Sequence, residues 1–421
     1  RPPRSTLFPY PTLFRSDNML AAADKQRVAE PFWSGFWKYL WNNPISSKDI
    51  PLDAVYDDQR VVAFLENEIA IRYDIPAAPA MPVPGESGFY PGVSGSEMDY
   101  TLSLQRINAA LSSNSNRTVI LETRQTRAPT PSIGLLEIML KDIINASTFD
   151  GLVELYLKDL RTGLVLHFTH SRIGEEEVPV NIAYSSWSTI KIPVLVSAFK
   201  RLSSPYDENV LTLMEQMVER SDNDSTDALA KAVIGSTFAP LDVTEDMQAL
   251  GLANTFWGGF FTLGSPLLQN FKTPANQRFD YNTEPDRYAQ TTPQDLGLLL
   301  EDIYYCAADY GGSLPLVFNG EITQEECRMM VEYLGLNRID VLIQAGVPAN
   351  VTVAHKHGWA YEVDDGYIHT IADAGIVYTP GGDYILAVFA HHPVQAVFDP
   401  VNLLVANLSA AAYNYFNLQN Q

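Results

Sequence analysis

The position of the strand-forming segments in the last two thirds of the chain limits its folds more than any other feature. Apolar runs typical of strands occur at residues 152–160, 164–170, 351–355, 367–378 and 384–391. The first two runs are joined by Arg161-Thr162-Gly163, a hairpin turn. Helix-forming patterns dominate from residue 188 to about residue 300. We therefore expect one antiparallel sheet built from early and late strands, with an all-helical region inserted between them.

Two further predicted helices and the amino-acid composition also agree with an α+β fold. Amphipathic patterns at residues 135–144 and 400–416 predict helices that flank the sheet. The chain has 421 residues, of which 46% are apolar and 11% aromatic, enough for a substantial core. We assign residues 131–421 to this one large domain.

The first 130 residues have a different character. Residues 1–16 read RPPRSTLFPYPTLFRS and look like a translated sequencing adapter, so we exclude them from fold reasoning. A signal peptide is not visible, and the sequence leaves open a membrane anchor upstream. For residues 17–130 we predict a small α+β module with helices within 18–48, 59–75 and 100–111 and a strand at 117–126. This order resembles the peptidoglycan-binding modules of bacterial envelope proteins; a wall-binding role and a plain spacer are both open.

Acidic residues outnumber basic ones, and the excess lies in the large domain. The chain has 28 Lys and Arg against 50 Asp and Glu, a net charge of −22. Residues 1–135 hold 13 basic and 14 acidic residues, which leaves 15 and 36 for the remainder. Because phosphate binding requires a basic surface, we exclude nucleic acid as a partner and disfavour anionic membranes. No apolar run approaches the ~18 residues of a spanning helix.

Cys306 and Cys327 are the two cysteines of the chain. Their spacing does not match a metal site, and the histidines show no metal-ligand spacing, so we expect no metal and no cofactor. The sequence leaves open whether the two cysteines form a disulfide or remain buried thiols. A disulfide would indicate an oxidising compartment.

Ser188 and Lys191 form the first candidate catalytic group. Ser188 follows a polar stretch and opens a predicted helix, where free N–H groups and the helix dipole face its hydroxyl. Lys191 lies three residues later on the same face, where it can act as a base if its pKa is lowered. Ser197 and Lys200 repeat the pattern, but Ser197 lies in mid-helix. Taken alone, a Ser-x-x-Lys pair also occurs by chance at the start of a helix.

Two further polar groups follow in the sequence. Ser221-Asp222-Asn223 precedes a helix, and its hydroxyl and carboxamide can point into one cavity, although Ser221 alone is typical of an N-cap. Lys356-His357-Gly358 lies on a predicted strand, where the lysine provides positive charge beside a bare backbone. Alone, this segment is typical of an ordinary edge strand.

The three groups together form a more specific pattern. Ser-x-x-Lys, Ser-Asp-Asn and Lys-x-Gly, in this order, are typical of class A β-lactamases and penicillin-binding proteins. From about Gly151 to its end the sequence resembles the serine β-lactamase and DD-peptidase superfamily, closest to class A-like members. The resemblance implies a β-lactamase/transpeptidase-like domain.

The resemblance also implies roles for the motif residues. Ser188 would be the acyl-forming nucleophile, Lys191 its general base or proton relay, and Ser221 the donor to the leaving group. Asn223 would hold the amide side chain of the substrate, and Lys356 would steady Ser221 and a substrate carboxylate.

The implied oxyanion hole consists of two backbone N–H groups. These are the N–H of Ser188 and that of Trp359, which follows Gly358.

The sequence departs from the family in three places. Only 33 residues separate Ser188 from Ser221, so part of the helical insertion is expected to be short. Glu284 is a candidate deacylation base nine residues before Pro293, and a solvated loop carboxylate is the alternative.

The third departure is His357, which replaces the usual hydroxyl residue of the lysine strand. We hypothesise that protonated His357 or His369 binds an anionic substrate, so that binding weakens between about pH 6 and 8.

The sequence thus predicts an extracytoplasmic serine hydrolase that forms an acyl-enzyme on Ser188. Its expected partner is a small-molecule or peptidoglycan-derived substrate, a β-lactam or a D-alanyl peptide, and we expect a monomer. A carboxylic esterase with the same chemistry and a penicillin-binding sensor or wall-binding protein without turnover are the alternatives.

Overall fold

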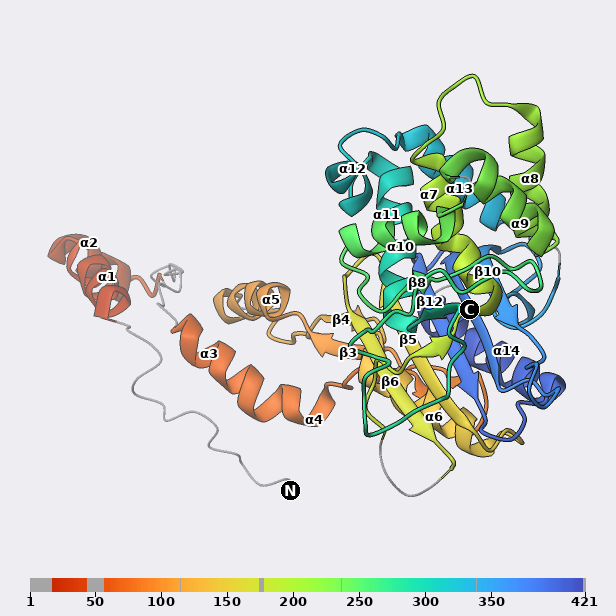
Figure 1. Cartoon of the computed structure of the whole chain (residues 1–421). Helices are drawn as coiled ribbons and strands as arrows, with labels where there is room; N and C mark the ends of the chain where they lie inside the picture. Colours follow the sequence, from red (N-terminus) through yellow and green to blue (C-terminus); the bar gives the residue numbers. More distant parts are fainter. Residues whose placement is uncertain are drawn as a thin grey trace. The chain divides into compact units, whose positions relative to one another are not determined.

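The computed structural model describes residues 17–43, 57–113, 115–173, 178–235, 237–337 and 339–418 (Figure 1). The adapter-like residues 1–16 lie outside the described part of the chain. The described residues form two compact units. One contains those before residue 80 and those from 92 to 129, and the other contains residues 80–91 and those from 130 onward.

The N-terminal unit is mainly helical. Its elements are α1 (Asp17–Val28), α2 (Phe32–Leu40), α3 (Asp58–Phe64), the π-helix η1 (Leu65–Ala70), α4 (Ile71–Tyr73), β3 (Gly95–Met98), α5 (Tyr100–Ser112) and β4 (Thr123–Thr126). Strands β3 and β4 pair antiparallel, and a small core forms around Val61, Leu65 and Met98. The strand predicted from residue 117 begins only at Thr123.

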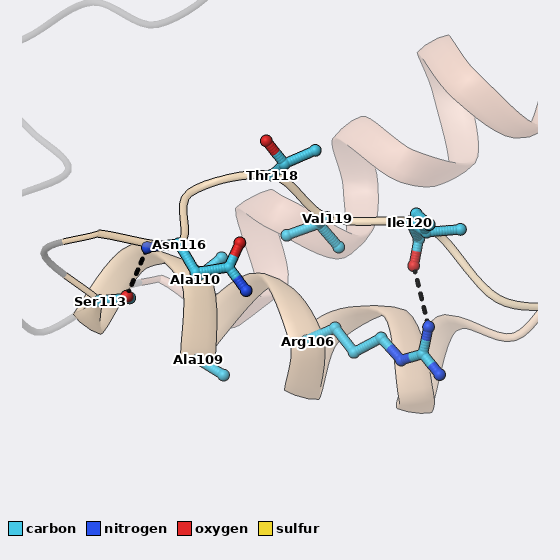
Figure 2. Close-up of a pocket in the computed structure, with 8 residues that line it drawn as sticks. All are labelled: Arg106, Ala109, Ala110, Ser113, Asn116, Thr118, Val119 and Ile120. Carbon is cyan, nitrogen blue, oxygen red and sulfur yellow. Dashed lines mark hydrogen bonds between the residues drawn. The ribbon is translucent and has the colours of Figure 1, made fainter.

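A hollow of about 470 Å³ lies in this unit between α5 and the segment that follows it (Figure 2). It is lined by Arg106, Ala109, Ala110, Ser113, Asn116, Thr118, Val119 and Ile120. Arg106 donates a hydrogen bond to the carbonyl oxygen of Ile120 at 3.3 Å and pairs with Glu122. The only charged side chain of its wall is therefore already paired, and the hollow gathers no set of reactive groups.

Residues 80–91 belong to the C-terminal unit although they interrupt the N-terminal module in sequence. They form the two-stranded pair β1 (Met81–Pro82) and β2 (Phe89–Tyr90). The Asn414 side chain donates to the carbonyl oxygen of Ser87 at 2.8 Å. The division between the units is therefore not the single cut near residue 130 that the sequence indicates.

A five-stranded antiparallel sheet forms the centre of the C-terminal unit. Its strand order is β10 (Thr352–Trp359), β11 (Thr370–Tyr378), β12 (Tyr384–His391), β5 (Leu152–Asp159) and β6 (Val165–Ser171). The register places Lys356 opposite Ala374, Ala374 opposite Ala387, and Ala387 opposite Tyr156. The prediction of one antiparallel sheet built from early and late strands is confirmed, and β10 is an edge strand.

Both faces of this sheet are buried, which explains why its strands read as nearly continuous apolar runs. On β12, Ile385 and Phe389 pack into the core on the side of the helical region. Leu386 and Val388 pack into the opposite core with α6 (Ile133–Ala146) and α14 (Phe398–Phe416). Figure 1 shows α6 and α14 at the sheet.

A mainly helical region is inserted between β6 and β10, as the sequence predicts, but it is not all-helical as expected. Its elements are the 3₁₀ helix η2 (Trp187–Ile190), α7 (Lys191–Phe199), α8 (Glu208–Glu219), α9 (Asn223–Leu229), η3 (Ala230–Ile234), α10 (Ala239–Ala249), α11 (Pro293–Asp309), α12 (Ser313–Val317), α13 (Gln324–Leu334) and η4 (Gln344–Gly346). Three short strands, β7 (Tyr184–Ser185), β8 (Phe256–Trp257) and β9 (Ala289–Thr291), form a second sheet. Of the two states left open for the cysteines, the structure has the disulfide, Cys306–Cys327, which joins α11 to α13.

Candidate active site

Ser188 and Lys191 lie at the start of the helical region. Ser188 is in the single turn η2, and Lys191 is the first residue of α7, so one turn of helix separates the two side chains. Lys191 Nζ lies 3.0 Å from Ser188 Oγ. Ser197, by contrast, is buried in the last turn of α7 and not in mid-helix as expected, and Lys200 pairs with Asp246 at 2.7 Å. Of the two Ser-x-x-Lys pairs, only the first joins its own serine and lysine in a hydrogen bond that the structure shows.

The Ser-Asp-Asn segment forms the turn between α8 and α9. Asp222 caps α9 by accepting the Ser225 N–H at 2.7 Å, and Ser221 adopts a left-handed conformation with φ of 57°. Lys191 Nζ lies 2.6 Å from the carbonyl oxygen of Ser221 and 2.7 Å from Asn223 Oδ1. This tight turn therefore places the backbone carbonyl of Ser221 and the side-chain amide of Asn223 within hydrogen-bond distance of Lys191.

Lys356 reaches the same serine from the edge strand β10. Its Nζ donates to Ser221 Oγ at 2.9 Å and to the carbonyl oxygen of His357 at 3.1 Å. Two residues further, β10 passes so close to η2 that a Cβ atom on Gly358 would lie 2.9 Å from the Ser188 nitrogen. A glycine is therefore required for this approach. The orientation of the Ser188 and Trp359 N–H groups as an oxyanion hole stays a prediction.

The two lysines are buried amines with lowered pKa values. Burial, and after it the charge of Lys356, lowers the pKa of Lys191 to about 6, against the opposing effect of Asp222 and Asp227. Burial also lowers the pKa of Lys356 to about 7, while Asp373 acts to raise it. A neutral lysine beside Ser188 and a cationic lysine beside Ser221 are thus both accessible near neutral pH.

The comparison with protein families decides the assignment. The model of the "Beta-lactamase enzyme family" matches residues 204–416, which is half of the chain. The chain belongs to the β-lactamase enzyme family. The matched segment contains Ser221, Asn223 and Lys356 and begins after Ser188 and Lys191. The fold predicted from the family resemblance is confirmed.

Several solved structures are similar to the chain at low identity. The structure of PBP-A is 19% identical, with 69% of this chain and 98% of that chain covered and a TM-score of 0.45. A class A β-lactamase from Bacteroides cellulosilyticus DSM 14838 is 17% identical, with 67% and 97% covered and a TM-score of 0.48. A β-lactamase from Desulfarculus baarsii DSM 2075 is 16% identical, with 68% and 98% covered and a TM-score of 0.48. Comparison with curated proteins finds no match.

His357 differs from its sequence-based expectation. It is buried, and burial, together with Lys356, His355 and Lys191, lowers its pKa to about 2. The direction of this pKa shift opposes a protonated His357 as an anion-binding group, and a role of His357 in substrate binding stays a prediction. Its ring instead stacks on Trp359 with centroids 4.6 Å apart.

His369, the other candidate for this charge, lies immediately before β11. Partial burial acts to lower its pKa, but hydrogen bonds to Asp365 and to the His392 carbonyl raise it above its ordinary value. The carboxylate of Asp365 already pairs with this ring, at 2.8 Å.

Glu284 is not among the groups that contact Lys191. It is an exposed residue with φ of 51°, in the 258–288 loop that connects β8 to β9. The residue of this loop that lies against the lysine is Phe261, whose ring centroid is 5.1 Å from Lys191 Nζ. Within the described part of the chain, Lys191 Nζ hydrogen-bonds to Ser188, Ser221 and Asn223 and to no carboxylate.

Asp227 of α9 holds Phe261 in this position. The carboxylate is buried and accepts the N–H groups of Phe261 at 2.9 Å and Thr262 at 2.8 Å. It also accepts the Thr262 hydroxyl at 2.6 Å. Sequence reasoning missed both Phe261 and Asp227, although an aspartate six residues after Ser221 on the predicted helix was an available signal.

Proposed function

We propose that this protein is a serine hydrolase that is acylated on Ser188 by β-lactams or D-alanyl-type amides and that releases the acyl group slowly. The observation that supports acylation is the set of oxygen atoms around Lys191. The carbonyl oxygen of Ser221 and Asn223 Oδ1 can only accept hydrogen bonds, and they lie nearest to Nζ, at 2.6 and 2.7 Å. A neutral lysine amine has two N–H groups, which these acceptors use. Its lone pair is then left for the Ser188 hydroxyl at 3.0 Å.

The acylation step follows from this arrangement. The hydroxyl proton of Ser188 passes to Lys191 Nζ as Oγ bonds to the substrate carbonyl carbon. When the tetrahedral intermediate collapses, the bond from carbon to the leaving nitrogen breaks. The proton reaches that nitrogen from Lys191 through Ser221, whose Oγ is 3.3 Å from Lys191 Nζ and also accepts from Lys356.

The aromatic ring that lies over Lys191 supports slow release of the acyl group. Hydrolysis of an ester requires a base that activates water. In class A β-lactamases a glutamate does this. Here Phe261 faces the lysine, and an aromatic ring cannot accept the proton of an attacking water.

Covalent labelling tests the proposal. We expect benzylpenicillin and an alkyl fluorophosphonate each to add one mass adduct to the wild-type protein. Ser188→Ala should receive none, and Ser197→Ala, the serine of the second Ser-x-x-Lys pair, should be labelled like the wild type. The absence of any adduct with both reagents, or labelling of Ser188→Ala, would contradict the proposal.

A further inference from the structure

Lys356 acts as a cation beside Ser221 in the proposed function, on which this inference rests, yet Lys356 is fully buried. Within the described part of the chain its Nζ hydrogen-bonds to Ser221 Oγ and to the carbonyl oxygen of His357, and to no carboxylate. A buried ammonium group is unfavourable unless a negative charge compensates it. The compensating charge must therefore come from a residue that does not touch the lysine.

Asp373 of β11 is a fully buried carboxylate close to Lys356 in the sheet. The register places Lys356 opposite Ala374 and His357 opposite Asp373. Because successive side chains point to opposite faces of a sheet, Lys356 shares the face of Ala374, which packs toward the helical region. Asp373 shares the opposite face with Val377, which packs with α14. The backbone of the sheet thus separates the amine from the carboxylate.

The hydrogen bonds of Asp373 leave its charge in place. Oδ2 accepts the N–H of Ile343 at 3.1 Å, and Oδ1 and Oδ2 lie 2.9 and 3.0 Å from Nδ1 of His355. One N–H group shared by both oxygens fits an ionised carboxylate, which can only accept. Nε2 of His355 is buried without a hydrogen-bond partner among the described residues, so a proton there would be an unsatisfied donor. The partners of Asp373 therefore do not cancel its charge.

The helical side of β10 does not supply this charge to Lys356. Lys191, which meets Lys356 at Ser221, is a second amine. Two acidic residues on this side, Asp222 and Glu326, accept backbone N–H groups at the starts of α9 and α13, at 2.7 and 2.8 Å. Their carboxylates thus cap helices.

The titratable groups within the sheet differ in their effect on Lys356. His357, next to it on β10, has a pKa that burial lowers to about 2, so its ring is neutral. Burial lowers the pKa of Lys356 to about 7, and the charge of Asp373 opposes this shift. Asp373 is thus the group whose charge favours the protonated amine.

We propose that Asp373 is a positioning residue for acylation, because its charge on the far face of the sheet keeps Lys356 protonated beside Ser221. Coulomb interactions act without contact, and they are strongest where both charges are excluded from water. Asp373 therefore acts on the reaction only through the lysine.

The pH dependence of acylation in Asp373→Asn tests this role. The carboxamide keeps the size of the side chain and an acceptor oxygen but removes the charge, so Lys356 should lose its proton at lower pH. Fluorophosphonate labelling should be nearly as fast as in the wild type at pH 5 and about tenfold slower at pH 8. Disturbed packing alone would slow labelling equally at every pH. A wild-type-to-variant rate ratio that does not rise with pH would overturn the inference.

Glu154→Gln is the matched control. Glu154 is a fully buried carboxylate of β5 in the same sheet, and like Asp373 it is bonded to a histidine ring and to a backbone N–H. These partners are His167, at 2.8 Å, and the N–H of Asn181, at 2.7 Å. The charge of Glu154 is not among those that act on Lys356. The rate ratio of this variant should therefore be independent of pH, and a rise equal to that of Asp373→Asn would contradict the assigned role.

Urea unfolding supplies a second measurement that needs neither activity nor a stable Asp373→Asn variant. Lys356→Met leaves the charge of Asp373 without its counter-charge. Asp373→Asn should therefore lower the unfolding midpoint less in the Lys356→Met background than in the wild type. Equal losses, or a double variant that does not fold although Lys356→Met does, would contradict the proposal. If no reagent labels the wild type, the proposed function fails instead, and the unfolding result still decides the coupling of the two residues.

Discussion

Lys191 and Lys356 are two buried amines within reach of one hydroxyl group, that of Ser221, at 3.3 and 2.9 Å. Burial disfavours the charged form of each, and the charge of Lys356 further disfavours a proton on Lys191. Protonating one of the two amines is therefore more favourable than protonating both. Lys191 is the amine that loses its proton first, since its pKa is lowered further.

The acylation rate should depend on pH in a way that follows from these two pKa values. Lys191 acts as a base only when neutral, so the rate should rise as pH increases through about 6. Lys356 donates to Ser221 only with its proton in place, so the rate should fall above about pH 7. Fluorophosphonate labelling from pH 5 to 9 measures this profile. A flat profile would contradict the assigned roles.

Lys191→Met should separate catalysis from stability. Removal of the base should lower the acylation rate about 10²- to 10⁴-fold. The free energy of unfolding should increase at pH 7, because an apolar chain of similar length replaces a buried amine. Lys200→Met, in the second Ser-x-x-Lys pair, should leave the acylation rate unchanged.

The sign of the pH effect on stability follows from the lowered pKa of Lys191. Between about pH 6 and the ordinary lysine value the folded state binds fewer protons than the unfolded chain, so wild-type stability rises with pH there. In urea unfolding experiments, the free energy of unfolding of Lys191→Met should therefore exceed that of the wild type by less at pH 10 than at pH 7. A difference that widens with pH would contradict this account.

At the scale of elements, the 258–288 loop determines what contacts Lys191. Buried Asp227 of α9 accepts the N–H groups of Phe261 and Thr262, which fixes the loop against the helix. The ring of Phe261 also packs 5.7 Å from that of buried Trp257. The identity of one side chain on this loop should thus control the lifetime of the acyl-enzyme.

Phe261→Glu should shorten that lifetime. It places a carboxylate beside Lys191, where it can activate water, and we expect release of the penicilloyl group to accelerate about 10²-fold or more. Phe260→Glu is the matched control, because the Phe260 ring lies over Lys231 at 4.6 Å instead. Equal release rates in the two variants would contradict the role assigned to Phe261.

The sequence predicts the regular elements of the large domain well and the contacts of its loops poorly. β12 is found at its predicted bounds because both of its faces are apolar. Phe261 lies 70 residues from Lys191, and its placement depends on hydrogen bonds to Asp227 that no local pattern reveals. The spacing of Glu284 from Pro293 makes it a candidate base, but spacing within an irregular loop does not determine the direction in which a side chain points.

At the scale of the whole molecule, the disulfide is the covalent link within the helical region. Cys306 and Cys327 are both fully buried, and they join α11, which packs on the sheet, to α13. None of the described helices is both long and apolar enough to cross a membrane. In this acidic unit Lys191 and Lys356 are the two amines that meet at Ser221, and the pKa of each is lowered.

Loss of the disulfide should lower stability without removing activity. The bridge closes a loop of 21 residues, which corresponds to about 3 kcal/mol of unfolded-state entropy. Cys306→Ala with Cys327→Ala should therefore unfold at lower urea concentration, while fluorophosphonate labelling of the folded variant stays near the wild-type rate. An unchanged unfolding midpoint would show that the bridge does not stabilise the fold.

The lifetime of the penicilloyl adduct on Ser188 tests the central claim most directly. The protein is acylated with benzylpenicillin, diluted rapidly to stop further labelling, and followed by intact mass and peptide mapping. We predict one adduct on the peptide that contains Ser188, which persists for minutes or longer in the wild type and disappears within seconds in Phe261→Glu. An adduct on another residue, no adduct at all, or release within seconds from the wild type would contradict the account.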